Sequence, residues 1–458
     1  MQSILLLGRQ PSLGLAELES LYGSKAVRKV GATAAVVDVD PCLLAFDRLG
    51  GSIKFCKILT SLETTNWKEI EKFVIKVAPG HSQQMPEGKM HLGLSVQGIE
   101  TNIRQLEATG LNIKKAIRKT GRSVRLVPNK ELELSSAQVH HNKLTTETGW
   151  ELVFIRDGDN TIVAQTVKVQ DIASYTVRDR ERPKRDARVG MLPPKLAQII
   201  LNLSTGKIPE DQLSSICDIP ADATIPRPKL DKTVLDPFCG TGVLLQEAIL
   251  MGYDAYGSDI DKRMVDYTTQ NLDWLKDMYT VSAGPVSLEI GDATNHQWAH
   301  TIDFVACETY LGKPFTGTPD PQVLAQTIGD CNLIIKKFLH NLWPQLRPGA
   351  RLCLAVPAWN MSPTHASTTS KPYLSGPRPD AAHKSRGTQY AQAIPRRMPE
   401  RVLSPASVQK NFRFLPLIDQ IEDLGYNRVS FEHVPNADLL YYRADQTVAR
   451  QLIVLIKR

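Results

Sequence analysis

The feature that most constrains the fold of this 458-residue chain is an apolar run that ends in an acid and a glycine turn. Residues 233–236 close with Asp236, the turn Pro-Phe-Cys-Gly-Thr-Gly carries Gly240 and Gly242, and a helical pattern follows over residues 243–251. Glycine adopts positive φ and lets a ligand come close to the backbone. A helix that begins there directs free N–H groups and a positive dipole end at a negatively charged group. The segment therefore predicts a strand, a ligand-binding turn and a helix.

Acidic residues stand at the ends of two further apolar stretches. Residues 255–258 lead into Asp259, and residues 286–291 lead into Asp292. An acid about twenty residues past a glycine turn can accept hydrogen bonds from both hydroxyls of a ribose, and Asp292 can accept one from an adenine amino group. With Asp236 facing an amine and the helix end facing a carboxylate, the predicted ligand is S-adenosyl-L-methionine. A nicotinamide dinucleotide is the alternative, since its sheet also carries an acid after the second strand.

The predicted cofactor-binding residues are the three acids, the two glycines and three residues that lie near the acids in sequence. Its members are Asp236, Phe238, Gly240, Gly242, Asp259, Ile260, Asp292 and Ala293. Each feature has a structural explanation of its own, because the glycines can serve a tight turn alone and Asp292 can cap a helix. Acids at three strand ends of one sheet favour the ligand. The turn has no Gly-Lys-Ser/Thr sequence, which argues against a triphosphate loop.

Apolar strand patterns alternate with helical patterns from residue 232 onward. Such alternation predicts parallel strands with helices on both faces of the sheet, a Rossmann-like doubly wound α/β domain. A helix is expected after Pro193-Pro194, because residues 196, 199, 200 and 203 are apolar at helical spacing. We assign residues 193–458 to this domain. Its expected strands are residues 233–236, 255–259, 286–291, 303–307, 351–356, 428–433 and 451–456.

The first 175 residues have a different pattern and predict a smaller α+β region. Between residues 101 and 145, nine basic residues stand against three acidic ones. Clustered positive charge attracts polyanions, and phosphate neutralisation supplies most sequence-independent affinity for nucleic acids. A solvated helix face without a ligand is the alternative. The expected strands are residues 3–7, 34–39, 90–96, 123–127, 135–140 and 150–155, with helices near 15–21 and at 102–119.

Other features of the sequence bear on compartment and connections. No apolar run approaches the roughly 20 residues that span a bilayer, and residues 4–7 lack the flanks of a signal peptide, so we expect a cytoplasmic protein. The seven cysteines include no Cys-x-x-Cys pair, which indicates neither a metal site nor a disulfide framework. A charged, solvated linker is expected over residues 176–192, and a long exposed basic loop over residues 361–403.

At its motifs the chain resembles the THUMP-domain tRNA guanine-N2 methyltransferases, the type that modifies guanine at position ten of tRNA in archaea and eukaryotes. The resemblance rests on residues 236–242, 257–261, 271–274 and 291–293, and upstream on residues 182–203. It implies a ferredoxin-like part, here residues 1–60, and a THUMP domain, here residues 61–175, which together bind the tRNA acceptor end. It also implies tRNA as the partner and S-adenosyl-L-methionine as the methyl donor.

The chain departs from that family at the catalytic motif. The family has Asp-Pro-Pro-Tyr-Gly after the fourth strand, whereas this chain has Cys-Glu308-Thr-Tyr310-Leu-Gly312. An exocyclic amino nitrogen shares its lone pair with the ring, so acceptors must bind its hydrogens and aim the lone pair at the methyl carbon. Glu308 can still accept a proton or a hydrogen bond, and Tyr310 can still stack on a base. They are the predicted catalytic residues, with a purely structural Glu308 as the alternative.

The sequence thus predicts an S-adenosyl-L-methionine-dependent methyltransferase that acts on the exocyclic amino group (N2) of a tRNA guanine. Two alternatives stay open at this point. One is amino methylation of another RNA or of DNA, because the catalytic motif differs from that of the family. The other is an RNA-binding protein that retains the cofactor pocket and has no activity.

Overall fold

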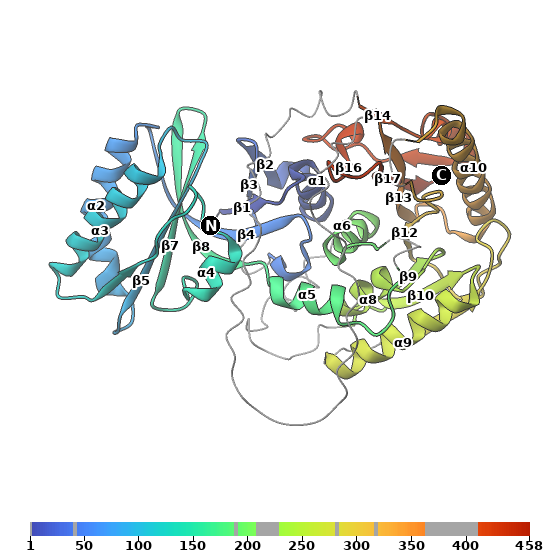
Figure 1. Cartoon of the computed structure of the whole chain (residues 1–458), viewed down its shortest axis with the longest axis horizontal. Helices are drawn as coiled ribbons and strands as arrows, with labels where there is room; N and C mark the ends of the chain where they lie inside the picture. The colour runs from blue at the N-terminus through green and yellow to red at the C-terminus, as the bar shows by residue number, and fades with distance from the viewer. Residues whose placement is uncertain are drawn as a thin grey trace.

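The computed structural model describes residues 2–39, 44–186, 191–207, 229–279, 284–315, 319–361 and 411–458. Within these ranges the strands form two sheets, one from residues 3–169 and one from residues 233–457 (Figure 1). The expected basic loop at residues 361–403 lies outside the described residues except for Met361, as do residues 187–190 of the expected linker and two of the seven cysteines.

The N-terminal sheet has eight strands among the described residues, in the order β2-β3-β1-β4-β8-β7-β5-β6. Neighbouring strands are antiparallel except that β5 runs parallel to β6 and β7. The long strands β4 and β8 pair with each other and join the two halves of the sheet. The division predicted near residue 60 falls within β4 and stays a prediction. The strands are β1 (Ser3–Leu7), β2 (Val27–Val30), β3 (Ala34–Val37), β4 (Ser52–Leu62), β5 (Met90–Gln97), β6 (Val124–Leu126), β7 (Gly149–Asp157) and β8 (Asn160–Val169).

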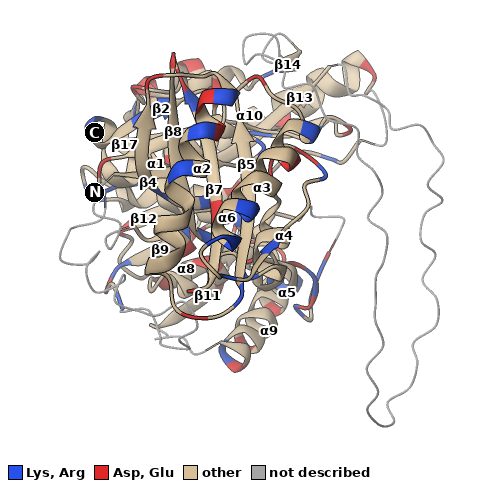
Figure 2. Cartoon of the chain, turned by 90° about the vertical axis from the view of Figure 1, so that its left-hand side faces the viewer, with Lys and Arg blue, Asp and Glu red and all other residues tan. Residues whose placement is uncertain are grey.

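Two helices, α2 (Trp67–Gln84) and α3 (Ile103–Arg118), cover the outer face of this sheet (Figure 1). The expected helix α3 begins where the Asn102 side chain accepts the N–H of Gln105 and the Asn102 N–H donates to the Gln105 side chain in return. We did not predict α2. Its buried residues have helical spacing, but Pro79 lies inside the helix and obscures the pattern. Basic residues lie along both helices (Figure 2).

The C-terminal sheet has the strand order β11-β10-β9-β12-β13-β17-β15, with β14 beside β13 and β16 beside β17. The first five strands of this order are parallel, and β17 is antiparallel to both of its neighbours. The strands are β9 (Thr233–Asp236), β10 (Asp254–Asp259), β11 (Val286–Ile290), β12 (Phe304–Glu308), β13 (Arg351–Asn360), β14 (Phe412–Arg413), β15 (Tyr426–Arg428), β16 (Leu440–Tyr441) and β17 (Val448–Lys457).

Helices cover both faces of this sheet, as the alternating pattern predicted. One face packs on α6 (Pro194–Thr205) and α8 (Val243–Leu250), with α9 (Lys262–Met278) toward the edge strand β11. The other face packs on α10 (Pro321–Leu342). The expected Rossmann-like doubly wound sheet is confirmed.

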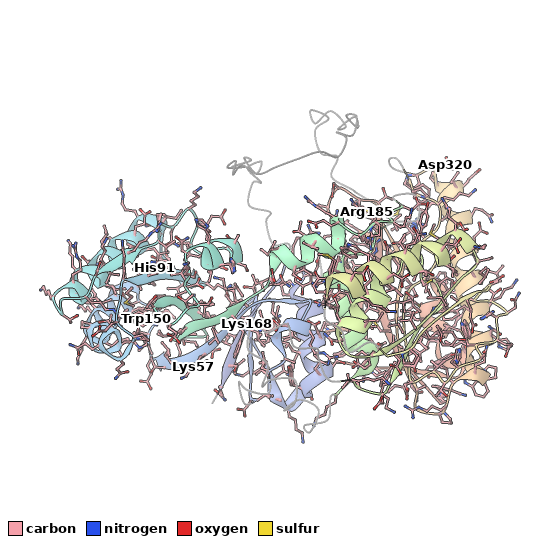
Figure 3. All side chains as sticks on the ribbon, turned by 90° about the horizontal axis from the view of Figure 1, so that it is seen from below. Lys57, His91, Trp150, Lys168, Arg185 and Asp320 are labelled. Carbon is pink, nitrogen blue, oxygen red and sulfur yellow. The ribbon has the colours of Figure 1, made fainter. Side chains whose placement is uncertain are left out.

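The two sheets share a hydrophobic core. Helix α1 (Pro11–Tyr22) lies against α6 between the sheets (Figure 1), and a single cluster joins Leu5 and Leu18 to Ile200, Val234 and Leu452. The N-terminal region therefore folds against the C-terminal domain over an apolar surface. Seen from below, the molecule is elongated, with Trp150 toward one end and Asp320 toward the other (Figure 3).

Three expectations from the sequence differ from the structure. The strand expected at residues 135–140 is a helix, α4 (Ser136–His141), because Ser135 and Gln138 form a capping box. The strand expected at residues 428–433 ends at Arg428, because the N–H groups of Glu432 and His433 donate to the Glu19 carboxylate of α1 instead. The solvated linker begins inside a helix, α5 (Ile172–Arg180), whose last turn contains Arg178 and Arg180.

Burial explains the third difference. Arg178 of α5 is 6% exposed and Arg182, just after it, is 2% exposed. Arg178 donates from Nε to the buried carboxylate of Glu247 in α8, at 2.7 Å. Arg178 and Arg182 are thus packed within the protein, whereas Arg180, Glu181 and Arg185 of the same segment are exposed to solvent, as expected of the linker.

Candidate active site

Three predicted site residues end neighbouring strands of the C-terminal sheet. Asp236, Asp259 and Glu308 are the last residues of β9, β10 and β12, and β9 lies between the other two strands. Side chains alternate between the faces of a strand, and residues two positions earlier, Val234 and Ala306, belong to the cluster under α6 and α8. The three carboxylates therefore lie on this one face, at the carboxyl edge of the parallel strands.

The turn between β9 and α8 has backbone conformations that favour glycine. Gly240 has φ 52° and Gly242, the N-cap of α8, has φ 79°. A Cβ atom on Gly242 would lie 2.8 Å from the Cγ2 atom of Thr268 in α9, which is too close. Thr268 also donates from Oγ1 to the carbonyl of Gly240 at 2.9 Å. The turn is thus held against α9, with the backbone of residues 240–242 close to the strand ends.

Asp259 is held by the backbone on both carboxylate oxygens. Its Oδ2 accepts the N–H of Gly240 at 2.9 Å and its Oδ1 accepts the N–H of Asp261 at 3.0 Å. Burial nevertheless raises the pKa of the Asp259 carboxyl. Each carboxylate oxygen has a second lone pair. Asp259 can therefore accept two further hydrogen bonds without losing its position.

Asp236 is a buried carboxyl that forms no ion pair with any described lysine or arginine. It is 3% exposed, and its Oδ1 accepts the N–H of Phe238 at 3.2 Å. Burial raises the pKa of Asp236 well above its ordinary value, and the negative charges of Asp259 and Glu308 raise it further. A positively charged group placed here would remove this electrostatic cost.

The remaining predicted cofactor residues are spread around these strand ends. Asp292 follows β11, and its Oδ1 accepts the N–H of Thr294 at 2.9 Å, so it caps a turn; no helix begins there, and the helix cap that was its structural alternative is not found. Ala293 is buried, whereas Ile260 is 70% exposed beside Asp259. Phe238 packs edge-on against the ring of Phe338 in α10, with 5.1 Å between ring centroids.

Glu308 forms an ion pair that no sequence pattern indicated. Its Oε1 accepts from Nε of Arg450 in β17 at 2.6 Å, and the two side chains are 15% and 10% exposed. The next residue, Thr309, donates its N–H to the carbonyl of Ala355 at 3.1 Å, which continues the pairing with β13 beyond the strand end. Arg450 is 142 residues away along the chain and lies in no recognisable motif, so only the folded sheet could reveal it.

Tyr310, the second predicted catalytic residue, lies on the loop after β12. Its side chain is 39% exposed, and burial of its remaining surface raises the pKa of the phenol, as do the nearby Cys331 and Asp330. Gly312 follows with φ 83°, where a Cβ atom would lie 2.6 Å from the Cγ2 atom of Thr327. The glycine that the motif retains thus lets this loop pass close to α10.

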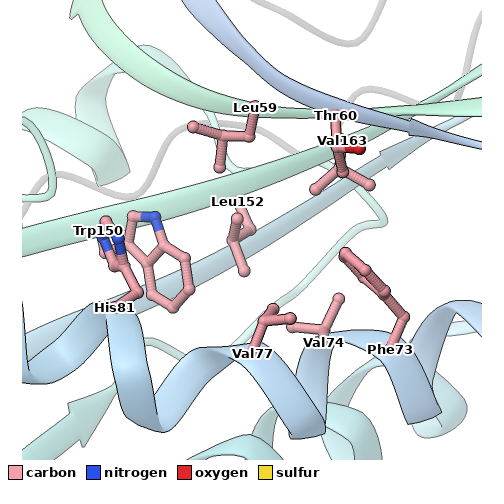
Figure 4. A pocket seen from close by; sticks show the side chains of 9 residues that line it. All are labelled: Leu59, Thr60, Phe73, Val74, Val77, His81, Trp150, Leu152 and Val163. Atoms are coloured by element: carbon pink, nitrogen blue, oxygen red, sulfur yellow. The ribbon is translucent and has the colours of Figure 1, made fainter.

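An apolar pocket lies far from these carboxylates, between α2 and the N-terminal sheet (Figure 4). It has a volume of about 250 Å³, and the rings of His81 and Trp150 stack at one end with 4.2 Å between centroids. Such a lining suits packing rather than transfer chemistry. Its lining residues are Leu59, Thr60, Phe73, Val74, Val77, His81, Trp150, Leu152 and Val163.

Two further observations concern the described ranges only. No group of three or more His, Cys, Asp or Glu side chains in them is placed to hold a metal ion. None of their helices combines the length and the apolar character that a membrane span requires.

Comparison with known proteins finds relatives of one kind. The chain is 29% identical over 171 residues to the tRNA (guanine(10)-N2)-dimethyltransferase of Methanothermobacter thermautotrophicus, which covers 37% of this chain and 39% of that protein. It is 27% identical over 198 residues to the enzyme of the same name from Pyrococcus abyssi, covering 42% and 47%. The chain therefore matches less than half the length of these curated relatives. No family model matches it.

Solved structures with related shapes include TrmN from Thermus thermophilus, with a TM-score of 0.44 and 14% identity over 100% of both chains. Another is a possible methylase from Clostridium difficile 630, with a TM-score of 0.42 and 12% identity over 78% of this chain and 89% of that one. At these TM-scores neither likeness adds to the argument. The matches in sequence confirm that the chain resembles the tRNA guanine-N2 methyltransferases.

Proposed function

We propose that this protein is an S-adenosyl-L-methionine-dependent methyltransferase that methylates the exocyclic N2 amino group of a guanine in tRNA. The observation that carries the proposal is the group of three carboxylates around the glycine turn, in which Asp236 is buried and pairs with no cation of the described residues. A cationic ligand that also has hydroxyl groups satisfies these side chains. The resemblance to the tRNA (guanine(10)-N2)-dimethyltransferases supports the substrate class.

The side chains at the strand ends fit this cofactor one by one. Asp236 would face its ammonium group, and Asp259, held in place by the backbone, can accept from ribose hydroxyls. The N–H groups at the start of α8 suit its carboxylate, and Asp292 is the acceptor for the adenine amino group. When bound, the cofactor supplies a methyl group on a positively charged sulfur, which is open to attack by a nucleophile.

Glu308 and Tyr310 are the residues that we assign to the base. Glu308 is at the carboxyl end of β12, next to the strand that carries Asp236, so its free oxygen can hold an amino hydrogen and orient the nitrogen. Tyr310 is 39% exposed and can stack on a base taken out of its helix. A stacked, hydrogen-bonded base has the fixed position that transfer between two bound groups needs.

The N-terminal sheet is the proposed tRNA-binding part, with residues 1–60 as a ferredoxin-like part and residues 61–175 as a THUMP domain. The support is the basic residues that lie along α2 and α3 (Figure 2) and the nine basic residues between positions 101 and 145. Phosphate contacts of this kind give affinity that falls steeply with salt. The protein's location in the cytoplasm belongs to the same proposal.

The test is transfer of an isotope-labelled methyl group from the cofactor to total tRNA, followed by digestion to nucleosides. We expect label in N2-methylated guanosine. The control is Asp259→Ala, which should weaken cofactor binding at least about tenfold, because it removes the acceptor for two hydroxyl groups. Label in a different nucleoside would replace guanine as the substrate. Cofactor binding without transfer to any RNA would instead identify an RNA-binding protein that has lost the reaction.

A further inference from the structure

Arg450 reaches Glu308 across a whole strand. Glu308 in β12 pairs with Ala355 of β13, and Arg450 in β17 pairs with Pro357 of the same strand, on its other side. Leu452, two positions after Arg450, belongs to the cluster under α6 and α8, so Arg450 and Glu308 leave the sheet on the same face. The residues of β13 between them are small or compact, which lets the two side chains meet above it.

The ion pair leaves part of each side chain available. It uses Nε of Arg450 and Oε1 of Glu308, at 2.6 Å. A guanidinium has five N–H donors and a carboxylate has two acceptor oxygens. Neither Oε2 of Glu308 nor the Nη groups of Arg450 bond to any described side chain, and none of these atoms is fully buried. Oε2 can therefore accept a hydrogen bond from a molecule bound at the strand ends.

Asp236 and Glu308 differ in what balances their charge. Asp236 is buried and forms no ion pair with the described residues, which suits a ligand that brings its own positive charge. Glu308 is mostly buried with an arginine that is already part of the protein. One oxygen of Glu308 is held by a charge-assisted hydrogen bond from Arg450, which fixes the position of the carboxylate. Glu308 therefore suits orientation of a bound substrate.

We propose that Arg450 is a positioning residue for the methyl transfer, and this rests on the function proposed above. Arg450 fixes Glu308 through one oxygen, so that the other oxygen holds an amino hydrogen of the base. The lone pair of the amino nitrogen then forms the new N–C bond while the S–C bond breaks and its electron pair stays on sulfur. The nitrogen, positively charged after the transfer, loses its proton to water.

The test compares Arg450→Met and Arg450→Lys with the wild type, in methyl-transfer rates measured from about pH 6 to 9 and in cofactor affinity measured by calorimetry. Arg450→Met should lower kcat about tenfold or more near pH 7. The loss should shrink as the pH rises, because a buried carboxylate without its cation gives up its proton only at higher pH. Cofactor affinity should change less than about twofold, because no cofactor group is assigned to this pair.

Arg450→Lys keeps the charge but not the planar fork, so it should restore part of the rate. If Arg450→Met does not fold, Arg450→Lys still tests the proposal. A wild-type kcat and pH profile in Arg450→Lys would show that the shape of the guanidinium at residue 450 does not position Glu308. Glu308→Gln removes the ionisable group. Adding Arg450→Met to Glu308→Gln should therefore leave the pH profile of that variant unchanged.

Arg351→Met is the matched control. Arg351 is a partly buried arginine at the opposite end of the same sheet, where its Nε donates to the carbonyl of Leu203 at 2.8 Å. Its loss should not change the pH profile of the rate. If Arg450→Met and Arg351→Met behaved alike, Arg450 would be structural and the inference would be wrong. A wild-type chain that binds the cofactor and methylates no RNA would overturn the proposed function, and the inference with it.

Discussion

Buried carboxylates lie in two regions of the protein, at the contact between its two sheets and at the strand ends of the C-terminal sheet. The two regions differ in the partners that these carboxylates have. At the contact, Glu17 of α1 accepts the N–H groups of Gly50 and Gly51 and the side chain of Asn202, and Glu247 of α8 is paired with Arg178. At the strand ends, Asp236 accepts one backbone N–H and has no cation among the described residues. Buried polar groups whose hydrogen bonds are satisfied within the protein belong to the fold, whereas a buried carboxyl that lacks a cation suits a ligand that brings one.

The paired region also explains why the two sheets form one unit. Arg48, from the short 3-10 helix Phe46–Arg48, donates to Oδ1 of Asn202 in α6 at 3.0 Å and to the hydroxyl of Tyr253 at 3.1 Å. These bonds link the N-terminal sheet to α6 and to the loop before β10. They lie beside the shared hydrophobic cluster. Removal of the N-terminal region would expose these polar groups and the hydrophobic cluster to water. The site is therefore best tested in the full chain.

The largest effect is expected at the contact between the sheets, from Arg178→Met. The change leaves the fully buried carboxylate of Glu247 without its cation, which should lower the free energy of unfolding by roughly 3 to 5 kcal/mol. Urea titration measures it. The control is Arg28→Met, which removes a largely exposed bond to Asp157 and should cost no more than about 1 kcal/mol. Equal losses would show that burial of the pair has no part in holding the sheets together.

Asp236→Asn should have the opposite effect on stability, because it should stabilise the ligand-free protein while weakening cofactor binding. It removes a buried, uncompensated carboxyl and keeps the oxygen that accepts from Phe238, so the free energy of unfolding without ligand should rise at neutral pH. Cofactor affinity should fall at least about tenfold, because the ammonium group loses its counter-charge. Calorimetry and urea titration give the two quantities. If Asp236→Asn were less stable than the wild type and bound the cofactor with wild-type affinity, Asp236 would stabilise the fold and would not be a cofactor-binding residue.

The smallest effect concerns Glu17, where burial raises the pKa of the carboxyl to about 7 from an ordinary value of 4.5. Between these two values the folded state holds a proton that the unfolded state has lost, so stability falls as the pH rises through this window. The contribution should be about 1 kcal/mol between pH 5.5 and 6.5. It is measured as the difference in urea titrations between the wild type and Glu17→Gln. If the free energy of unfolding changed equally with pH in both proteins, Glu17 would already be ionised in the folded state.

Local chemistry made part of this structure predictable. The strand at residues 233–236, the glycine turn and the acids at the ends of β9 and β10 all depend on contacts within a few residues or on hydrophobic periodicity, which the sequence displays directly. The helix α3 was predicted for the same reason, because its cap and apolar spacing are local. The roles of these residues in binding stay predictions until a ligand is measured.

Tertiary contacts decided the rest. By itself the sequence determined which residues form the glycine turn and which acids end the strands. It did not determine that Arg450 pairs with Glu308, that Glu19 takes the backbone donors of residues 432 and 433, or that Arg178 is buried. Each of these contacts joins residues at least 69 positions apart. These residues become neighbours only when the two sheets fold and pack. Hydrophobic periodicity and local motifs extend over a few residues, so they do not indicate such contacts.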